Sequence, residues 1–333
     1  MRRPAHAGLW FSAQPCALLP MLNWVVIGIG DIATRRVIPA IQAEPRSRLY
    51  GLVTRDPAKG VPYDARVWAS LDDALTDSAV QAVYVATPVF LHAQQTIQSL
   101  RAGKHVLCEK PMGMNEAEAR SMVQTAEDSG RTLGVAYYRR SYPKVQRARQ
   151  LLDAGAIGKP VVAELTSHNW FDEQQSDRSW LIDPARAGGG PLYDIASHRI
   201  DMLNFLFGRP QRVSAQLSNA VHHYAVEDNA TVMIEYAGGV RGLVDVRWHS
   251  KVKRDECRIR GTEGEMELTP LNGPELIYPG GRENLAPHAN LHYPMIENFV
   301  AAVLDGSPLL AGGESSLWTD WVIARARESN GAV

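Results

Sequence analysis

Short apolar runs alternate with longer amphipathic stretches between residues 22 and 142. The apolar runs are rich in β-branched residues, which is typical of buried strands, and the amphipathic stretches are typical of helices. Ser70 stands where it can cap one helix, and Gly103 and Gly130 stand where two others end. Strands that alternate with helices predict a parallel sheet covered by helices on both faces. The expected strands span 24–28, 48–54, 82–86, 105–108 and 132–137, and the expected helices span 32–43, 71–76, 91–102 and 115–129.

The pattern changes after Pro143, where a helix over 144–154 precedes longer extended stretches. Turn signals such as Gly238-Gly239 separate these stretches, which predicts a largely antiparallel sheet. The expected strands span 161–169, 210–219, 229–236, 239–249, 255–260 and 265–269, and further helices span 193–207, 293–304 and 314–328.

These patterns predict an α/β fold class with two domains and a leading segment. Residues 1–21 form an N-terminal extension that we expect to be disordered. A Rossmann domain with a doubly wound parallel sheet follows over 22–142, and an α+β domain with a large open, mostly antiparallel sheet occupies 143–333. We expect the second domain to bind the substrate and to mediate oligomerisation. Its sheet leaves a face that needs a cover, so we expect a homodimer or homotetramer.

Composition narrows the class of protein. A length of 333 residues fits two domains rather than one. A net charge of −1 provides no basic field for nucleic acid or an anionic membrane, and no apolar run is long enough to span a bilayer. Cys16, Cys108 and Cys257 are scattered, which favours a reducing compartment and a cytoplasmic location. Prolines and polar residues interrupt the first twenty residues, so we interpret them as a tail rather than a signal peptide.

A glycine motif follows the first strand and opens the first helix, and it has the pattern G-x-G-x-x-A. Gly28 permits a tight turn, Gly30 lets the backbone approach a pyrophosphate, and Ala33 keeps helix and strand close. The free N–H groups at the start of the helix then face the phosphates. The motif therefore predicts a nicotinamide dinucleotide site. Its residues are Gly28, Ile29, Gly30, Asp31, Ile32 and Ala33.

The end of the second strand bears on the choice between NAD and NADP. An acidic residue there would bind the ribose 2′-hydroxyl, but this chain has Thr54-Arg55. A hydroxyl and a guanidinium suit a 2′-phosphate, which favours NADP. NAD remains possible if Arg55 is only a solvated loop charge.

Two further motifs resemble those of the Gfo/Idh/MocA oxidoreductases. AGKHVLCEKP runs from Ala102 to Pro111 after a strand that ends in Ala86-Thr87-Pro88, and a GGG run from Gly188 precedes Asp194 and His198. The likeness extends from about Leu22 to the C-terminus. It implies a Rossmann domain followed by an open-sheet domain, and activity on sugars, polyols and related hydroxy compounds. The layout is also similar to that of 1,5-anhydrofructose reductases, a NADP-dependent group that shares the VED at 226–228 and the GTEG at 261–264.

Three residues are suited to moving a hydride to or from a carbon that bears oxygen. Such a reaction needs a base for the hydroxyl proton, and His198 suits this role because the unperturbed pKa of histidine lies near neutrality. Asp194 lies four residues earlier, on the same face of a helix, where it could orient His198 or hold a substrate hydroxyl. Lys110 would stabilise alkoxide charge at the end of the fourth strand. The resemblance implies the same roles. The alternatives are a surface Lys-Pro turn and a structural Asp–His pair.

The resemblance also implies contacts around these residues. Glu109 is expected on the cofactor side of the pocket, and Ala86, Thr87, Pro88 and His92 are expected to line the nicotinamide and ribose, although a structural role fits His92 equally. Tyr138 and Trp180 are expected substrate contacts, although a packing role fits Trp180 equally. Tyr138 replaces an asparagine that the family often has before an arginine pair, and Leu181 after Trp180 replaces an arginine.

The sequence thus predicts an NADP-preferring dehydrogenase or reductase that acts on CH–OH or C=O groups of a sugar or polyol. A cofactor-binding regulator without turnover and a nicotinamide-dependent glycosidase are the alternatives. We expect no metal site, because His222-His223 and the pair His288 and His292 have no acidic or cysteine partner at a recognisable spacing.

Overall fold

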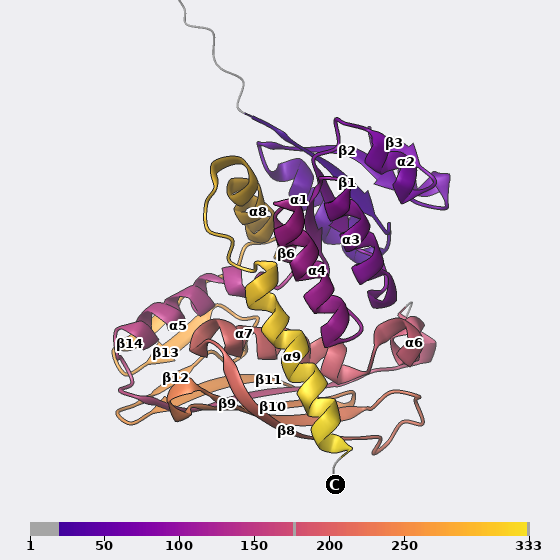
Figure 1. Ribbon diagram of the computed structural model, residues 1–333. Coiled ribbons are helices and arrows are strands. Elements are labelled where there is room, and N and C mark those ends of the chain that lie inside the picture. The colour runs from indigo at the N-terminus through magenta and orange to yellow at the C-terminus, as the bar shows by residue number, and fades with distance from the viewer. Residues whose placement is uncertain (1–19, 176–177, 332–333) are drawn as a thin grey trace, which may run out of the picture.

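The computed structural model describes residues 20–175 and 178–331. Nearly all of the expected N-terminal extension, including Cys16, lies outside these residues. Two sheets form the framework, one above the other in Figure 1. Within the described part of the chain, no helix is both long and apolar enough to cross a membrane.

The first sheet has six parallel strands in the order β3-β2-β1-β4-β5-β6. Reversal of the strand order at β1 and β4 is the hallmark of a doubly wound sheet, and ligands bind at this switch point. The sequence predicted five of the strands, but not the three-residue edge strand β3. The strands are β1 Leu22–Ile27, β2 Ser47–Val53, β3 Arg66–Trp68, β4 Ala82–Val85, β5 His105–Cys108 and β6 Leu133–Val135.

Helices cover both faces of this sheet, and their ends follow capping rules. The Ser70 hydroxyl accepts a hydrogen bond from the N–H of Asp73 at the start of α2, and Asn115 does the same for Glu118 at the start of α4. The first helix differs from prediction, because it opens with a π-helical turn. Pro39 has no N–H to donate to the carbonyl of Arg35, so regular α-helical bonding cannot continue there. The elements are η1 Ala33–Val37, α1 Ile38–Ala43, η2 Pro57–Gly60, α2 Leu71–Thr76, η3 Val89–Leu91, α3 His92–Arg101 and α4 Glu116–Ser129.

The second sheet has eight strands in the order β14-β13-β12-β11-β7-β10-β9-β8. All neighbours are antiparallel except β7 and β10, which run parallel. The predicted fold class is therefore confirmed, with β13 and β14 as additions. The strands are β7 Pro160–Trp170, β8 Pro210–Ser218, β9 Asn229–Tyr236, β10 Arg241–Arg247, β11 His249–Gly261, β12 Glu265–Glu267, β13 Glu275–Tyr278 and β14 Gly281–Asn284.

One face of this sheet is covered by the long helices of the second half. Apolar side chains of α5, α7 and α9 form one core with the inward side chains of β7, β9 and β10. The helical elements are η4 Tyr138–Ser141, α5 Pro143–Asp153, η5 Glu173–Gln175, η6 Ser179–Ile182, α6 Pro184–Ala187, η7 Leu192–Ala196, α7 Ser197–Phe207, η8 Ala237–Gly239, α8 Tyr293–Asp305 and α9 Gly313–Asn330.

The last two helices tie the halves together. Helix α8 returns to the first sheet, where Phe299 packs on Trp24 with ring centroids 5.2 Å apart. Helix α9 runs from the first half toward the second sheet (Figure 1). Leu317 near its start packs into the apolar core of the first sheet. Val322 and Ile323, farther along the helix, pack into the core between the second sheet and its helices. The C-terminal segment therefore completes the core of the N-terminal domain, which the division at residue 142 did not anticipate.

Candidate active site

The glycine loop after β1 has the geometry that a dinucleotide requires. Gly28 has φ +88°, and a Cβ there would lie 2.7 Å from the carbonyl carbon of Ala86, so only glycine fits. A Cβ at Gly30 would meet nothing within 4 Å, so open space faces this part of the backbone. Ala33 is fully buried where the helix packs against the sheet. The loop therefore fits a pyrophosphate at the switch point.

The other residues of the motif hold this loop or face solvent. Ile29 is buried in the core, and Ile32 is half-buried. Asp31 is exposed and lies 3.4 Å from the guanidinium of Arg35, one turn later. The Asp31 side chain is therefore engaged with Arg35 at the surface.

The loop after β2 presents an unpaired cation. The Thr54 hydroxyl accepts a hydrogen bond from the N–H of Asp56 (3.1 Å), and the Asp56 carboxylate accepts one from the N–H of Ala58 (3.1 Å). Arg55 between them is exposed, and no hydrogen bond or ion pair holds it within the described residues. Because β2 neighbours β1, Arg55 lies at the same edge of the sheet as the glycine loop.

The segment after β4 is fixed against the glycine loop. The N–H of Ala86 donates to the carbonyl of Ile27 (2.8 Å), and the Thr87 hydroxyl donates to the amide oxygen of Gln95 (2.7 Å). Ala86, Thr87 and Pro88 are each half-buried.

His92 has a structural setting rather than an exposed one. Its ring is buried, with Nδ1 2.9 Å from the carbonyl oxygen of Pro111 and Nε2 2.8 Å from that of Thr87. The ring therefore clamps the loop after β4 to the loop after β5. The peptide bond between Lys110 and Pro111 is cis. This geometry favours a structural role for His92 over a role in lining the nicotinamide and ribose.

Lys110 and Asp194 meet between the two domains. The Lys110 ammonium donates to the backbone carbonyl of Asp194 (2.8 Å) and lies 3.3 Å from its Oδ1, while Arg178 lies 2.8 Å from the same oxygen. Burial alone would raise the pKa of Asp194, but the charges and hydrogen bonds of Lys110 and Arg178 lower it to about 2. Asp194 is therefore an ionised carboxylate between two cations.

His198 lies next to this pair on α7. Its ring is buried, and burial, followed by the positive charges of Lys110, Arg139 and Arg199, holds its pKa well below the usual value. The imidazole is therefore neutral at neutral pH and can accept a proton. Its Nδ1 has no hydrogen-bond partner, so Asp194 does not orient His198 through that nitrogen.

Glu109 is buried behind Lys110. Its carboxylate accepts a hydrogen bond from the Tyr84 hydroxyl (2.8 Å), and Nε2 of His292 lies 3.4 Å from it. Burial raises the pKa of Glu109, but His292, Tyr84 and Lys110 together lower it below its usual value. Among the described residues, no group of three or more potential ligands gathers to hold a metal ion.

Of the two expected substrate contacts, one lies against His198. The Tyr138 ring lies 5.0 Å from that of His198 and 4.9 Å from that of His292, centroid to centroid. Trp180 instead packs against an apolar cluster of the second domain that includes Phe171 and Trp248.

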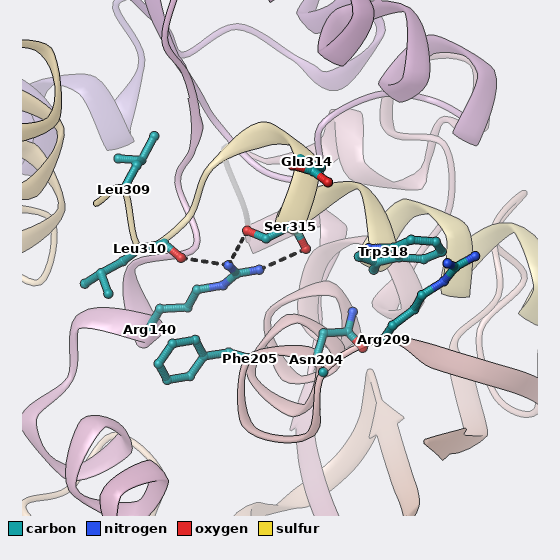
Figure 2. A pocket seen from close by; sticks show the side chains of 10 residues that line it. Arg140, Asn204, Phe205, Arg209, Leu309, Leu310, Glu314, Ser315 and Trp318 are labelled. Atoms are coloured by element: carbon teal, nitrogen blue, oxygen red, sulfur yellow. Dashed lines mark hydrogen bonds between the residues drawn. The ribbon is translucent and has the colours of Figure 1, made fainter. Parts of the chain in front are cut away.

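A cavity of about 420 Å³ lies between the end of α7 and the start of α9 (Figure 2). No residue that the sequence singled out for catalysis lines it. On its wall Arg140 donates to the carbonyl of Leu310 (2.8 Å) and to the Ser315 hydroxyl (2.7 Å). The cavity therefore lies at the contact between α7 and α9, and neither Lys110, Asp194 nor His198 is among its lining residues.

Sequence reasoning missed Arg178, Tyr84 and the role of His292. Arg178 lies in the loop before the GGG run, and His292 lies directly before α8. Both reach the site only because the chain folds back, and neither carries a local motif. Tyr84 had a weak signal, as a polar hydroxyl inside a fully buried strand.

Two family models match most of the described chain. The model of the oxidoreductase family with an NAD-binding Rossmann fold matches residues 22–137, and that of the GFO/IDH/MocA C-terminal domain matches residues 145–267. Trans-1,2-dihydrobenzene-1,2-diol dehydrogenase of Oryctolagus cuniculus is 32% identical over 332 residues, which cover 91% of this chain and 96% of that protein.

Two further relatives resemble the chain at similar coverage. The 1,5-anhydro-D-fructose reductase of Ensifer adhaerens is 28% identical over 313 residues, which cover 90% of this chain and 93% of that protein. The crystal structure of aldose-aldose oxidoreductase from Caulobacter crescentus, complexed with glycerol, superposes with a TM-score of 0.84 at 26% identity. That match covers 94% of this chain and 98% of the other.

Proposed function

The chain belongs to the Gfo/Idh/MocA oxidoreductase family, and on this premise we propose that it is an NADP(H)-preferring dehydrogenase or reductase of a sugar or polyol. The observation that carries the proposal is the contact of Lys110 with Asp194, beside a neutral His198, at the edge of the sheet where the glycine loop lies. The names of the relatives, among them a 1,5-anhydro-D-fructose reductase, support a sugar-like substrate.

Each of the three residues has a distinct task at a CH–OH or C=O carbon. When bound, the nicotinamide supplies or accepts the hydride. The Lys110 ammonium stabilises negative charge on the substrate oxygen and lowers the pKa of its hydroxyl. Asp194, held ionised, orients that ammonium and can accept a hydrogen bond from a substrate hydroxyl. The neutral imidazole of His198 accepts the hydroxyl proton in oxidation and returns a proton in reduction.

The free guanidinium of Arg55 supports the preference for NADP. A 2′-phosphate at the end of β2 would meet this guanidinium and the nearby Thr54 hydroxyl. The Asp56 carboxylate already caps η2, so it is not free to bind a ribose hydroxyl. The residues present therefore fit NADP better than NAD.

Absorbance of the reduced nicotinamide tests the proposal. Keto-sugars are offered with NADPH or NADH, and polyols and aldoses with NADP or NAD. Lys110→Met and His198→Ala are expected to lower kcat/KM by roughly 10²- to 10⁴-fold, because each removes charge stabilisation or proton transfer. The exposed residues Lys159 and His223 provide the matched controls Lys159→Met and His223→Ala, which should keep full activity. Undiminished turnover in Lys110→Met would contradict the proposed mechanism.

A further inference from the structure

Two adjacent arginines after Tyr138 are both buried, but only one has an acidic partner. Arg140 forms an ion pair with Asp201, using both Nε (2.9 Å) and Nη2 (2.5 Å). Arg139 is 6% exposed, and its Nη2 donates to the amide oxygen of Asn272 (3.3 Å). Its Nε and Nη1 have no hydrogen-bond partner, and no carboxylate pairs with it in the part of the chain that the structure describes.

An unpaired guanidinium is costly to bury. Desolvation of an ion in a protein interior costs several kcal/mol unless a counter-charge and hydrogen bonds compensate it. The guanidinium of Arg139 lies 5.0 Å from the centre of the Tyr138 ring, a cation–π contact that offsets only part of this cost. The free chain therefore holds a positive charge in a place where an anion would be strongly favoured.

The neighbours of Arg139 hold it in place without neutralising it. The N–H of Asn272 donates to Oδ2 of Asp255 (3.2 Å), and Oδ1 of Asp255 accepts from Arg199 (3.0 Å). Arg199 is also buried, and its Nε has no partner. Burial and then the nearby charge of Arg139 lower the pKa of Arg199 to about 10. Asp255 thus pairs with Arg199, and among the described residues the positive charge of Arg139 remains without a paired carboxylate.

This charge lies beside the catalytic residues. Tyr138, which Arg139 contacts, has its ring 5.0 Å from that of His198. The charges of Arg139 and Lys110 both act on His198. A substrate whose reacting carbon is near Lys110 and His198 could therefore reach Arg139 with another part of the same molecule.

We infer that Arg139, with Arg199 beside it, binds an anionic group of the substrate, so that the substrate is an acidic sugar. A carboxylate, as in a uronic acid, fits better than a phosphate, because it carries one negative charge and matches the single uncompensated cation. The inference rests on the proposed function and adds the substrate class to it. Arg139 acts here as a specificity-determining residue that contacts a part of the substrate remote from the hydride.

Binding and turnover are measured with three matched probes: D-glucuronate, D-glucose and D-glucose 6-phosphate. Full-length protein with saturating NADP is assayed by thermal shift and by nicotinamide absorbance. Glucuronate is expected to raise Tm and to exceed glucose in kcat/KM. Arg139→Gln lowers that preference by about 100-fold, chiefly through KM, because a charge-assisted contact is lost. Arg139→Lys keeps the positive charge but lacks the planar, forked N–H donors of a guanidinium. It should therefore retain part of the preference for glucuronate over glucose.

Arg209→Gln is the control, because it removes an exposed arginine that lies over the Trp318 ring rather than over Tyr138, and it should leave the preference unchanged. Each ligand-induced shift is compared with the same variant's own Tm, so a change in stability is not mistaken for loss of binding. Equal stabilisation of wild type and Arg139→Gln by glucuronate would overturn the inference, even if sugars are turned over. Stabilisation by glucose 6-phosphate but not by glucuronate would overturn the inference that the anionic group is a carboxylate rather than a phosphate. Glucuronate binding through Arg139 without turnover of any sugar would instead count against the proposed function.

Discussion

At the scale of single residues, the two neighbouring arginines predict opposite effects on stability. Arg140→Gln leaves Asp201 buried without its cation, which is expected to cost about 3–5 kcal/mol of unfolding free energy. Arg139→Gln removes a buried charge that has no acidic partner, so the loss should be far smaller. Urea unfolding of both variants measures the difference. Equal destabilisation would mean that Arg139 has a counter-charge in the free protein.

The prediction that the protein prefers NADP to NAD depends on Arg55. Arg55→Ala should raise the KM for NADPH by roughly 10- to 100-fold, because a charge-assisted contact with the 2′-phosphate is lost. The KM for NADH should change little, since NADH has no such phosphate. Initial rates with both cofactors provide the measurement, and the exposed Arg35, which already lies near Asp31, provides the control Arg35→Ala. Parallel changes for both cofactors would indicate that Arg55 only stabilises the loop.

The residues that we propose for catalysis were identified from sequence because their signals are local. Lys110 ends a recognisable ten-residue motif, and Asp194 and His198 follow a glycine run at a fixed spacing. The resemblance built on these motifs is confirmed by matches to both family models. The partners of these residues were not predictable in the same way. Arg178 reaches Asp194 by a loop whose course depends on tertiary packing rather than on sequence pattern.

At the scale of secondary-structure elements, helix α9 supports the loop that carries Lys110. Oδ1 of Asp320 on α9 accepts a hydrogen bond from the N–H of Gly113 (3.2 Å), and its Oδ2 is buried without a partner. Burial raises the pKa of Asp320 to about 8, and the neighbouring charge of Asp201 adds to the effect. The side chain is therefore protonated in the folded protein at neutral pH.

This raised pKa predicts how stability depends on pH. In the unfolded chain the carboxyl loses its proton near pH 4, whereas the folded protein keeps it to about pH 8. The folded state thus loses stability relative to the unfolded chain as pH rises from about 4 to about 8, and the loss then levels off. Asp320→Asn cannot ionise, so its Tm relative to wild type should rise across this range by roughly 5 °C or more. Thermal melts between pH 5 and 9 test this, and parallel curves would contradict it.

Most elements were predictable from periodicity, and those that were not share a physical reason. Strands β3, β13 and β14 are short and mostly not buried, so they lack the buried apolar run that marked the equally short β4 and β5. The apolar face of α8 was evident, but periodicity does not say which surface a helix covers. Met295 and Phe299 pack on the first sheet, from which more than 150 residues separate them in sequence.

At the scale of the whole molecule, the outer face of the second sheet remains uncovered by helices. One row across it consists of Ser214, Met233, Leu243, Glu164 and Arg258 on five adjacent strands. Met233 is 42% exposed and stands directly opposite Leu243. Around this apolar pair the face carries polar side chains such as Asp245 and Arg247. An apolar centre with a polar rim is the usual anatomy of an interface between proteins.

We therefore expect two copies of the chain to pair through this face, since a closed twofold contact buries the same patch on both. Met233→Arg places like charges at the centre of such an interface and should shift the measured mass toward that of one chain. Val61→Arg alters an exposed valine of the first domain instead and should leave the mass unchanged. Size-exclusion chromatography with light scattering distinguishes these outcomes. A wild-type mass of one chain at micromolar concentration would show that the open face is simply solvated, as its charged rim can permit.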